Sequence, residues 1–187
     1  MQKVITLALA TGFAGLLPAA ARAEERLDLS LLSLASGGLE LRYGRAEAGR
    51  GWEVAAGLLP LSVASEASTD DGWLGLLRAG YLVPLSGADG SDKTAATPLG
   101  LRLSAVLLQA ALDDGLRDRS LYQTGAAAEA VLTLRWRPRA DLEVSGEAGL
   151  LGGYGWGMAT AVRKNETGRT EGPFWAPSLH LLVGRRW

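Results

Sequence analysis

The stretch Leu142–Val162, LEVSGEAGLLGGYGWGMATAV, indicates the fold class because its residues alternate in character with a period of two. One set of alternate positions is mostly large and apolar, and the other is small or acidic. The first set comprises Leu142, Val144, Ala148, Leu150, Tyr154, Trp156, Met158 and Val162, and the second Glu143, Ser145, Glu147, Gly149, Gly153, Gly155, Gly157 and Ala159. Successive side chains of a strand point to opposite faces, so this pattern predicts a two-faced β-strand typical of a transmembrane barrel.

The same alternation recurs along the chain and predicts an all-β fold, a single eight-stranded antiparallel transmembrane up-and-down β-barrel. An even number of strands places both termini on one side, as in single-chain bacterial barrels. The first two predicted strands could instead form one long bent strand, which would make the count odd. The expected strands are Leu27–Leu34, Leu39–Arg45, Trp52–Ala64, Trp73–Leu85, Leu99–Leu112, Leu121–Arg137, Leu142–Val162 and Trp175–Trp187. Loops rich in turn-forming or charged residues are expected between them, including Glu66–Gly72, Asp113–Ser120 and Arg163–Phe174.

The N-terminus has the three-part layout of a secretory signal peptide. Lys3 precedes the apolar run Val4–Leu17, and a run of small residues ends in Ala21-Arg22-Ala23. The alternative is a membrane anchor, but the apolar run is shorter than the ~20 residues that span a bilayer. We therefore predict a signal peptide over residues 1–23 and a barrel domain over 24–187, in the outer membrane of a Gram-negative cell.

The composition excludes several classes of function. The chain has no cysteine and one histidine, so it can form neither a disulfide, nor a thiol nucleophile, nor a histidine-rich metal site. Beyond the predicted signal peptide, 17 basic face 20 acidic residues, and this near-neutral balance gives no support to nucleic-acid binding. Only Lys93 and Lys164 remain there, both in expected loops, which suggests that much of the surface does not face water. We expect no catalytic residues, no cofactor and no metal.

Alternation alone does not distinguish a membrane barrel from a water-soluble, lipocalin-like one, and the aromatic residues provide the distinction. All six Trp and four Tyr fall on the aliphatic face of their strands. One group lies toward the periplasmic rim if the termini are periplasmic: Tyr43, Trp52, Tyr81, Trp136 and Trp187. The other lies toward the opposite rim: Trp73, Tyr122, Tyr154, Trp156 and Trp175. Two aromatic girdles indicate that the aliphatic face contacts lipid.

The opposite face then becomes the lumen, and its charges nearly balance. Its acidic residues are Asp28, Glu40, Glu53, Glu129, Glu143 and Glu147, and its basic residues are Arg42, Arg78, Arg102, Arg135 and Arg186. An eight-stranded barrel has an interior that side chains fill, so these groups are expected to pair across the axis. The alternative is that they cover the solvated face of a soluble sheet.

The last strand, Ser178–Trp187, ends on an aromatic residue with apolar residues at alternate positions before it. It resembles the C-terminal assembly signal of outer-membrane proteins, and the whole barrel resembles the small eight-stranded OmpA-like family. The resemblance implies a monomer in the outer-membrane lipid bilayer, with the barrel assembly machinery and periplasmic chaperones as partners during biogenesis. Arg185 departs from the pattern because it lies on the apolar face, near enough to the rim to reach the headgroups.

For function, the sequence favours a non-enzymatic barrel with a side-chain-filled charged lumen, in a structural, envelope-integrity or surface-interaction role. The alternatives are a narrow ion or small-solute channel and a lipid-modifying barrel enzyme. The enzyme would need His180 as base with Ser178 on the same face, but both are expected to point into the lumen, away from lipid, as interior hydrogen-bonding residues.

Overall fold

The computed structural model describes residues 23–47, 50–65, 68–85, 99–114, 119–161 and 166–187. The predicted signal peptide, apart from Ala23, lies outside the described residues and stays a prediction. Lys93 and Lys164 also lie outside them, so their placement in loops stays a prediction. In the described part of the chain, no helix is long and apolar enough to cross a membrane.

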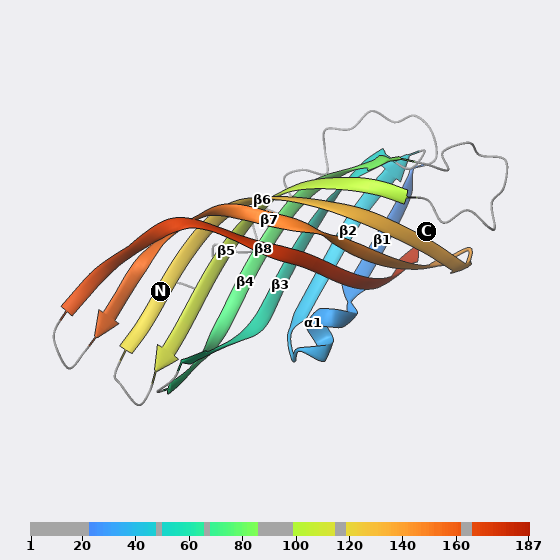
Figure 1. Ribbon diagram of the computed structural model, residues 1–187. Coiled ribbons are helices and arrows are strands. Elements are labelled where there is room, and N and C mark those ends of the chain that lie inside the picture. The colour runs from blue at the N-terminus through green and yellow to red at the C-terminus, as the bar shows by residue number, and fades with distance from the viewer. Residues whose placement is uncertain (1–22, 48–49, 66–67, 86–98, 115–118, 162–165) are drawn as a thin grey trace, which may run out of the picture.

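Eight strands form one closed barrel in which each strand pairs antiparallel with the next and the last pairs with the first (Figure 1). The predicted all-β, eight-stranded, up-and-down fold is confirmed, and the first two strands are separate. The strands are β1 (Glu24–Ser30), β2 (Leu39–Glu47), β3 (Arg50–Ser65), β4 (Ser68–Pro84), β5 (Leu99–Asp114), β6 (Arg119–Arg139), β7 (Leu142–Ala161) and β8 (Glu166–Arg186).

The strands are staggered around the barrel. Paired residues followed from Leu27 of β1 through each neighbouring strand arrive at Trp175 of β8. Leu27 itself pairs with Arg185 of β8, ten residues away from Trp175. Such a stagger inclines the strands by roughly 35–45° to the barrel axis.

Strand lengths depart from the sequence expectation at the end of the barrel away from the termini. Much of the expected loops Glu66–Gly72 and Arg163–Phe174 is strand, because β4 begins at Ser68 and β8 at Glu166. The expected loop Asp113–Ser120 is likewise shortened at both ends. Backbone ladder hydrogen bonds do not depend on side-chain polarity, so pairing continues into segments whose composition is typical of loops.

The first predicted strand is wrong in its second half. It ends at Ser30, and a short helix α1 (Leu31–Ala35) follows. The Ser30 hydroxyl caps this helix by accepting from the backbone N–H of Ser33 at 3.2 Å. Gly37, with a φ of 82°, then reverses the chain into β2.

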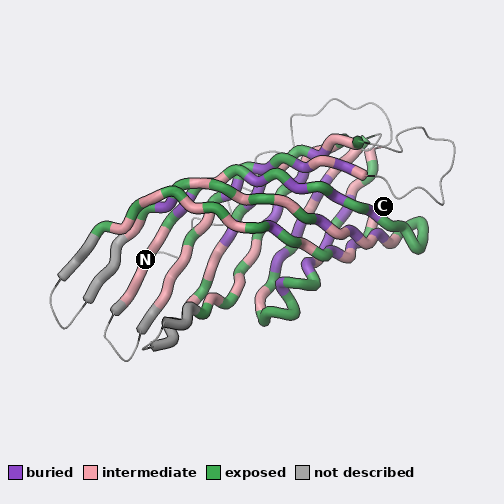
Figure 2. Tube along the Cα trace, viewed as in Figure 1, coloured by how far each residue is buried: buried purple, intermediate pink, exposed green. Residues whose placement is uncertain are grey.

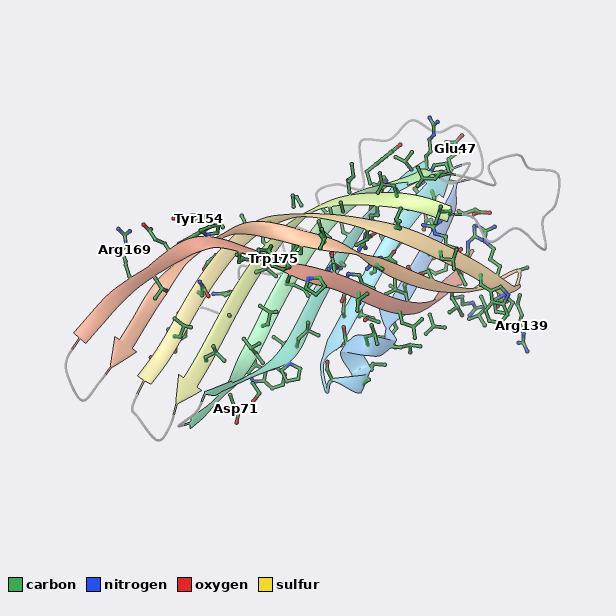
Figure 3. All side chains as sticks on the ribbon, in the orientation of Figure 1. Glu47, Asp71, Arg139, Tyr154, Arg169 and Trp175 are labelled. Carbon is green, nitrogen blue, oxygen red and sulfur yellow. The ribbon has the colours of Figure 1, made fainter. Side chains whose placement is uncertain are left out.

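Burial alternates along each strand, and the barrel has reversed polarity relative to a water-soluble protein (Figures 2 and 3). Arg42 and Arg102 are completely buried, whereas Leu107 and Leu150 are 58% and 63% exposed. Most of the strongly buried residues lie toward the end that carries the C-terminus. The described part of the molecule therefore has a charged interior at one end and an apolar exterior.

Candidate functional site

Charged side chains fill the lumen near the chain ends. Every one of the eleven residues that the sequence places in the lumen lies there and makes at least one ion pair. One further member, Arg26 of β1, was missed because the predicted strand began one residue later. We call these twelve the lumenal network: Arg26, Asp28, Glu40, Arg42, Glu53, Arg78, Arg102, Glu129, Arg135, Glu143, Glu147 and Arg186.

With Arg26 included, six arginines face six carboxylates. The period-two pattern could have found Arg26, because it lies two positions before Asp28 on the same face of β1. Its guanidinium lies 3.3 Å from Asp28 and 3.2 Å from Glu143. The balance matters because an uncompensated charge in the narrow interior would be costly.

Glu53 of β3 lies at the centre of the network. Its carboxylate is 2.5 Å from Arg26 and 2.5 Å from Arg102, and one oxygen is 3.3 Å from Arg42. These three arginines come from β1, β5 and β2, so Glu53 links strands on different sides of the lumen. Planar guanidinium groups suit this arrangement because each can bridge two carboxylates.

Glu147 of β7 completes the centre. Nη1 of Arg42 donates to both of its carboxylate oxygens at 2.9 Å, in a bifurcated, charge-assisted contact. Arg102 lies 2.9 Å from the same carboxylate, and the Thr133 hydroxyl donates to it at 3.3 Å. Charged side chains thus cross the lumen from several directions at this level.

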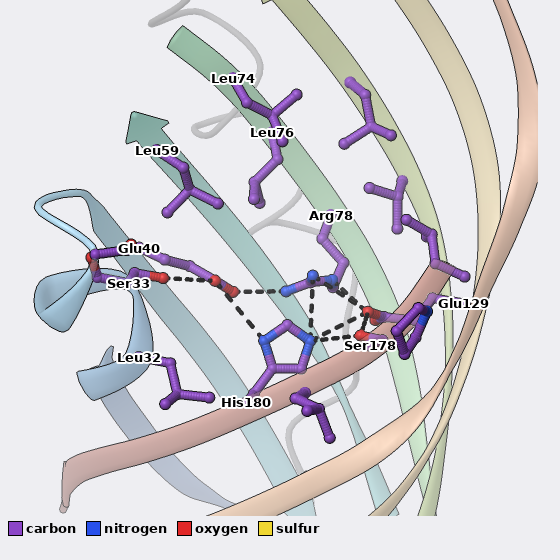
Figure 4. A pocket seen from close by; sticks show the side chains of 16 residues that line it. Leu32, Ser33, Glu40, Leu59, Leu74, Leu76, Arg78, Glu129, Ser178 and His180 are labelled. Atoms are coloured by element: carbon purple, nitrogen blue, oxygen red, sulfur yellow. Dashed lines mark hydrogen bonds and ion pairs between the residues drawn. The ribbon is translucent and has the colours of Figure 1, made fainter. Parts of the chain in front are cut away.

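Above the network, away from the chain ends, the lumen becomes apolar and contains a cavity of about 280 Å³ (Figure 4). Leu59, Leu76 and Val106 form part of its wall. Alternation along a strand shows which residues face inward but not where their side chains leave space, so the sequence did not predict this cavity.

The cavity floor is polar and includes Ser178 and His180 of β8, in the interior position that the sequence predicted (Figure 4). Ser178 Oγ donates to Glu129 Oε1 at 2.5 Å and lies 2.9 Å from His180 Nε2. His180 Nε2 is also 3.1 Å from Glu129, and Nδ1 is 3.8 Å from a Glu40 oxygen. The imidazole therefore lies between two carboxylates of the lumenal network.

The ten predicted girdle residues lie toward the two ends of the barrel wall, in outward positions. Eight are exposed, and Tyr43 and Trp52 are half-buried against each other, with ring centroids 5.6 Å apart. Tyr154 and Trp175 illustrate the group at the end away from the chain termini (Figure 3). Among the described residues, no cluster of His, Asp and Glu is arranged to hold a metal ion.

No protein-family model and no curated protein matches this sequence. Among solved structures, the crystal structure of a major outer membrane protein from Thermus thermophilus is similar, with a TM-score of 0.57 and 10% sequence identity. The match covers 89% of this chain and 100% of that chain. At this identity the likeness concerns the fold alone, and the chain therefore shares the barrel fold of that outer membrane protein.

Proposed function

We propose that this chain is an outer-membrane β-barrel that does not form a pore and that serves a structural or interaction role in the envelope. The observation that carries the proposal is the lumenal network. Its six arginines and six carboxylates lie at one end of an eight-stranded barrel, whose interior is just wide enough for side chains. A continuous path for hydrated ions would have to separate these pairs.

The exterior supports membrane insertion. Leucines on outward positions of several strands, such as Leu58, Leu103 and Leu132, are about half exposed, and aromatic residues lie toward both ends. An apolar surface this extensive is far larger than the patches that soluble monomers expose. We further propose membership of the OmpA-like barrels, with a monomeric state and assembly by the barrel machinery; the closed eight-stranded antiparallel topology and the exposed aromatic residues toward both ends support this.

Acyl-ester hydrolysis by Ser178 and His180 is less well supported. The Ser178 hydroxyl donates to Glu129 at 2.5 Å, and a carboxylate so close to the oxygen opposes the negative charge that a nucleophile must carry. We expect the folded chain to release no fatty acid from phospholipid vesicles, and His180→Ala to behave identically. Release that the substitution abolishes would make the protein an enzyme.

Conductance across planar bilayers tests the proposal directly. After heat-dependent gel mobility has verified folding, the barrel is expected to remain electrically silent over a range of voltages. Discrete conductance steps would overturn the proposal, and the charged residues of the lumenal network would then be selectivity residues of a channel.

A further inference from the structure

The barrel wall is incomplete in the half away from the chain ends. The ladder between β1 and β8 ends at the pair Ser30–Leu182, and the ladder between β2 and β3 ends at the pair Leu39–Leu58. Both β3 and β8 continue well beyond these points, while the intervening chain folds into α1. In the part of the chain that the structure describes, an edge of β3 and an edge of β8 therefore flank a gap, which begins at α1 and extends away from the chain ends (Figure 1).

The prolines of β8 lie along this gap. Arg186 donates its backbone N–H toward Asp141 beside β7, whereas Trp187 donates toward Glu25 of β1. Because backbone direction alternates along an antiparallel strand, the odd-numbered residues of β8 direct their backbone groups to the β1 side. Pro173 and Pro177 are both odd-numbered, so neither interrupts the ladder with β7, and neither presents a donor to the gap.

A proline at the facing edge of β3 completes the pattern. Pro60 lies two residues beyond the last β2 partner and is paired only with β4. Proline is accommodated in sheets mainly at edges, and its missing N–H reduces the cost of leaving backbone unpaired. The three prolines therefore suit strand edges that no neighbouring strand covers.

The lining of the cavity includes residues from the elements that border the gap, namely α1, β3 and β8. It is lined by Ser178 and His180, which point into the lumen, and also by Pro177 and Leu179, which alternate with them and point outward. Leu179 is 63% exposed on the outer face of the barrel. Leu32 of α1 also lines the cavity and is exposed (Figure 4). The interior cavity is therefore continuous with the outer surface of the barrel.

The gap lies at the depth of the apolar exterior. Trp175 belongs to the aromatic group at the end of the barrel away from the chain termini, which we call the upper rim. Pro177 and Leu179 follow it along β8 toward the chain ends. At that depth in a bilayer, an opening in the barrel wall faces lipid hydrocarbon. Other backbone donors of this β8 edge, such as those of Trp175 and Leu179, would lack acceptors in pure hydrocarbon.

We propose that the cavity binds one acyl chain of a bilayer lipid, which enters sideways between β3 and β8. The inference rests on the proposed membrane-inserted barrel. Leu59, Leu76 and Val106 provide an apolar wall, and about 280 Å³ is slightly below the ~300–1,000 Å³ of small-molecule pockets, which suits one chain rather than a whole lipid. An acyl ester also supplies carbonyl oxygens that can accept from the free edge of β8.

Nuclear Overhauser effects between lipid chains and lumenal methyl groups test this binding, because they report direct contact only. The methyl-labelled chain is placed in nanodiscs of phosphatidylcholine with protonated acyl chains. We expect cross-peaks from acyl methylenes to Leu76 and Val106, which are buried in the cavity wall. Leu107 faces outward and should also give them, whereas Val131, buried outside the cavity lining, should give none.

Cavity-filling variants provide the matched control. Leu76→Trp is expected to abolish the cross-peaks at Val106, while Leu77→Trp, on the outward neighbouring position, should leave them intact. Cross-peaks only from added free fatty acid, or none at Leu76 and Val106, would overturn the inference. Conductance of the same preparation separates the two proposals: a silent barrel without lumenal contacts rejects acyl-chain binding alone, and a conducting barrel rejects the closed lumen.

Discussion

Glu53→Gln is expected to destabilise the barrel by about 3–5 kcal/mol, because it leaves buried guanidinium groups without their carboxylate. Glu53 is the shared partner of Arg26, Arg42 and Arg102 and is almost completely buried. Glutamine keeps the size of the side chain and removes its charge, so packing is preserved while the electrostatic balance is lost. The free energy of unfolding, measured by urea titration in lipid vesicles with tryptophan fluorescence, gives the effect.

Glu171→Gln is the matched control. Glu171 lies on an outward position of β8 and is exposed, so the same chemical change there should alter stability by less than about 0.5 kcal/mol. Equal losses for the two variants would show that the ion pairs of the lumen contribute nothing beyond ordinary surface charges. A large loss of unfolding free energy for Glu53→Gln alone would show that the ion pairs at the closed end of the lumen stabilise the fold.

Leu150→Arg is expected to cost roughly 2–4 kcal/mol, the penalty for a cation on the lipid face near the middle of a bilayer. Leu150 points outward on β7, between Val144 toward the chain ends and Trp156 toward the other rim. The same vesicle unfolding experiment measures this change. Partition of the folded variant into membranes should fall with it.

Thr124→Arg introduces the same cation on the outward face but nearer the end of the barrel. A comparison with Leu150→Arg therefore separates the effect of membrane depth from that of the arginine itself. Thr124 is exposed on β6 and pairs directly with Trp156, so it lies at the upper aromatic rim. A cation near the interface costs only about 0–1 kcal/mol. If both arginine variants were as stable as the parent, the outward face would be solvated, and the membrane assignment would fail.

The closed part of the lumen and the gap between β3 and β8 lie in different halves of the barrel. The lumenal network lies where β1 and β2 complete the wall, and the cavity lies above it, beside the gap that their short length leaves. Ser178 and His180 lie at the boundary, with hydrogen bonds to Glu129 of the network and surfaces that line the cavity. The network therefore also forms the floor of the proposed acyl-chain site.

Alternation along the chain was enough to establish the two faces of each strand, and it favoured eight strands, although only the structure showed that the first two are separate. Side chains alternate strictly along a strand, so a stretch such as Leu142–Val162 shows which residues share a face without any knowledge of its neighbours. The same reasoning placed eleven charged residues on the inner face before their partners were known. Arg26 escaped only because the end of a strand is weakly marked in sequence.

Which charges meet, and where the wall is open, became clear only in the folded barrel. Whether Glu53 contacts Arg102 of β5 depends on the register and stagger of the strands between them, which side-chain pattern does not encode. The leucine-rich residues of α1 suit a helix as well as a strand, and only their surroundings select the helix. The gap arises because β1 and β2 end early while β3 and β8 continue, a difference in length that becomes an opening only when the sheet closes.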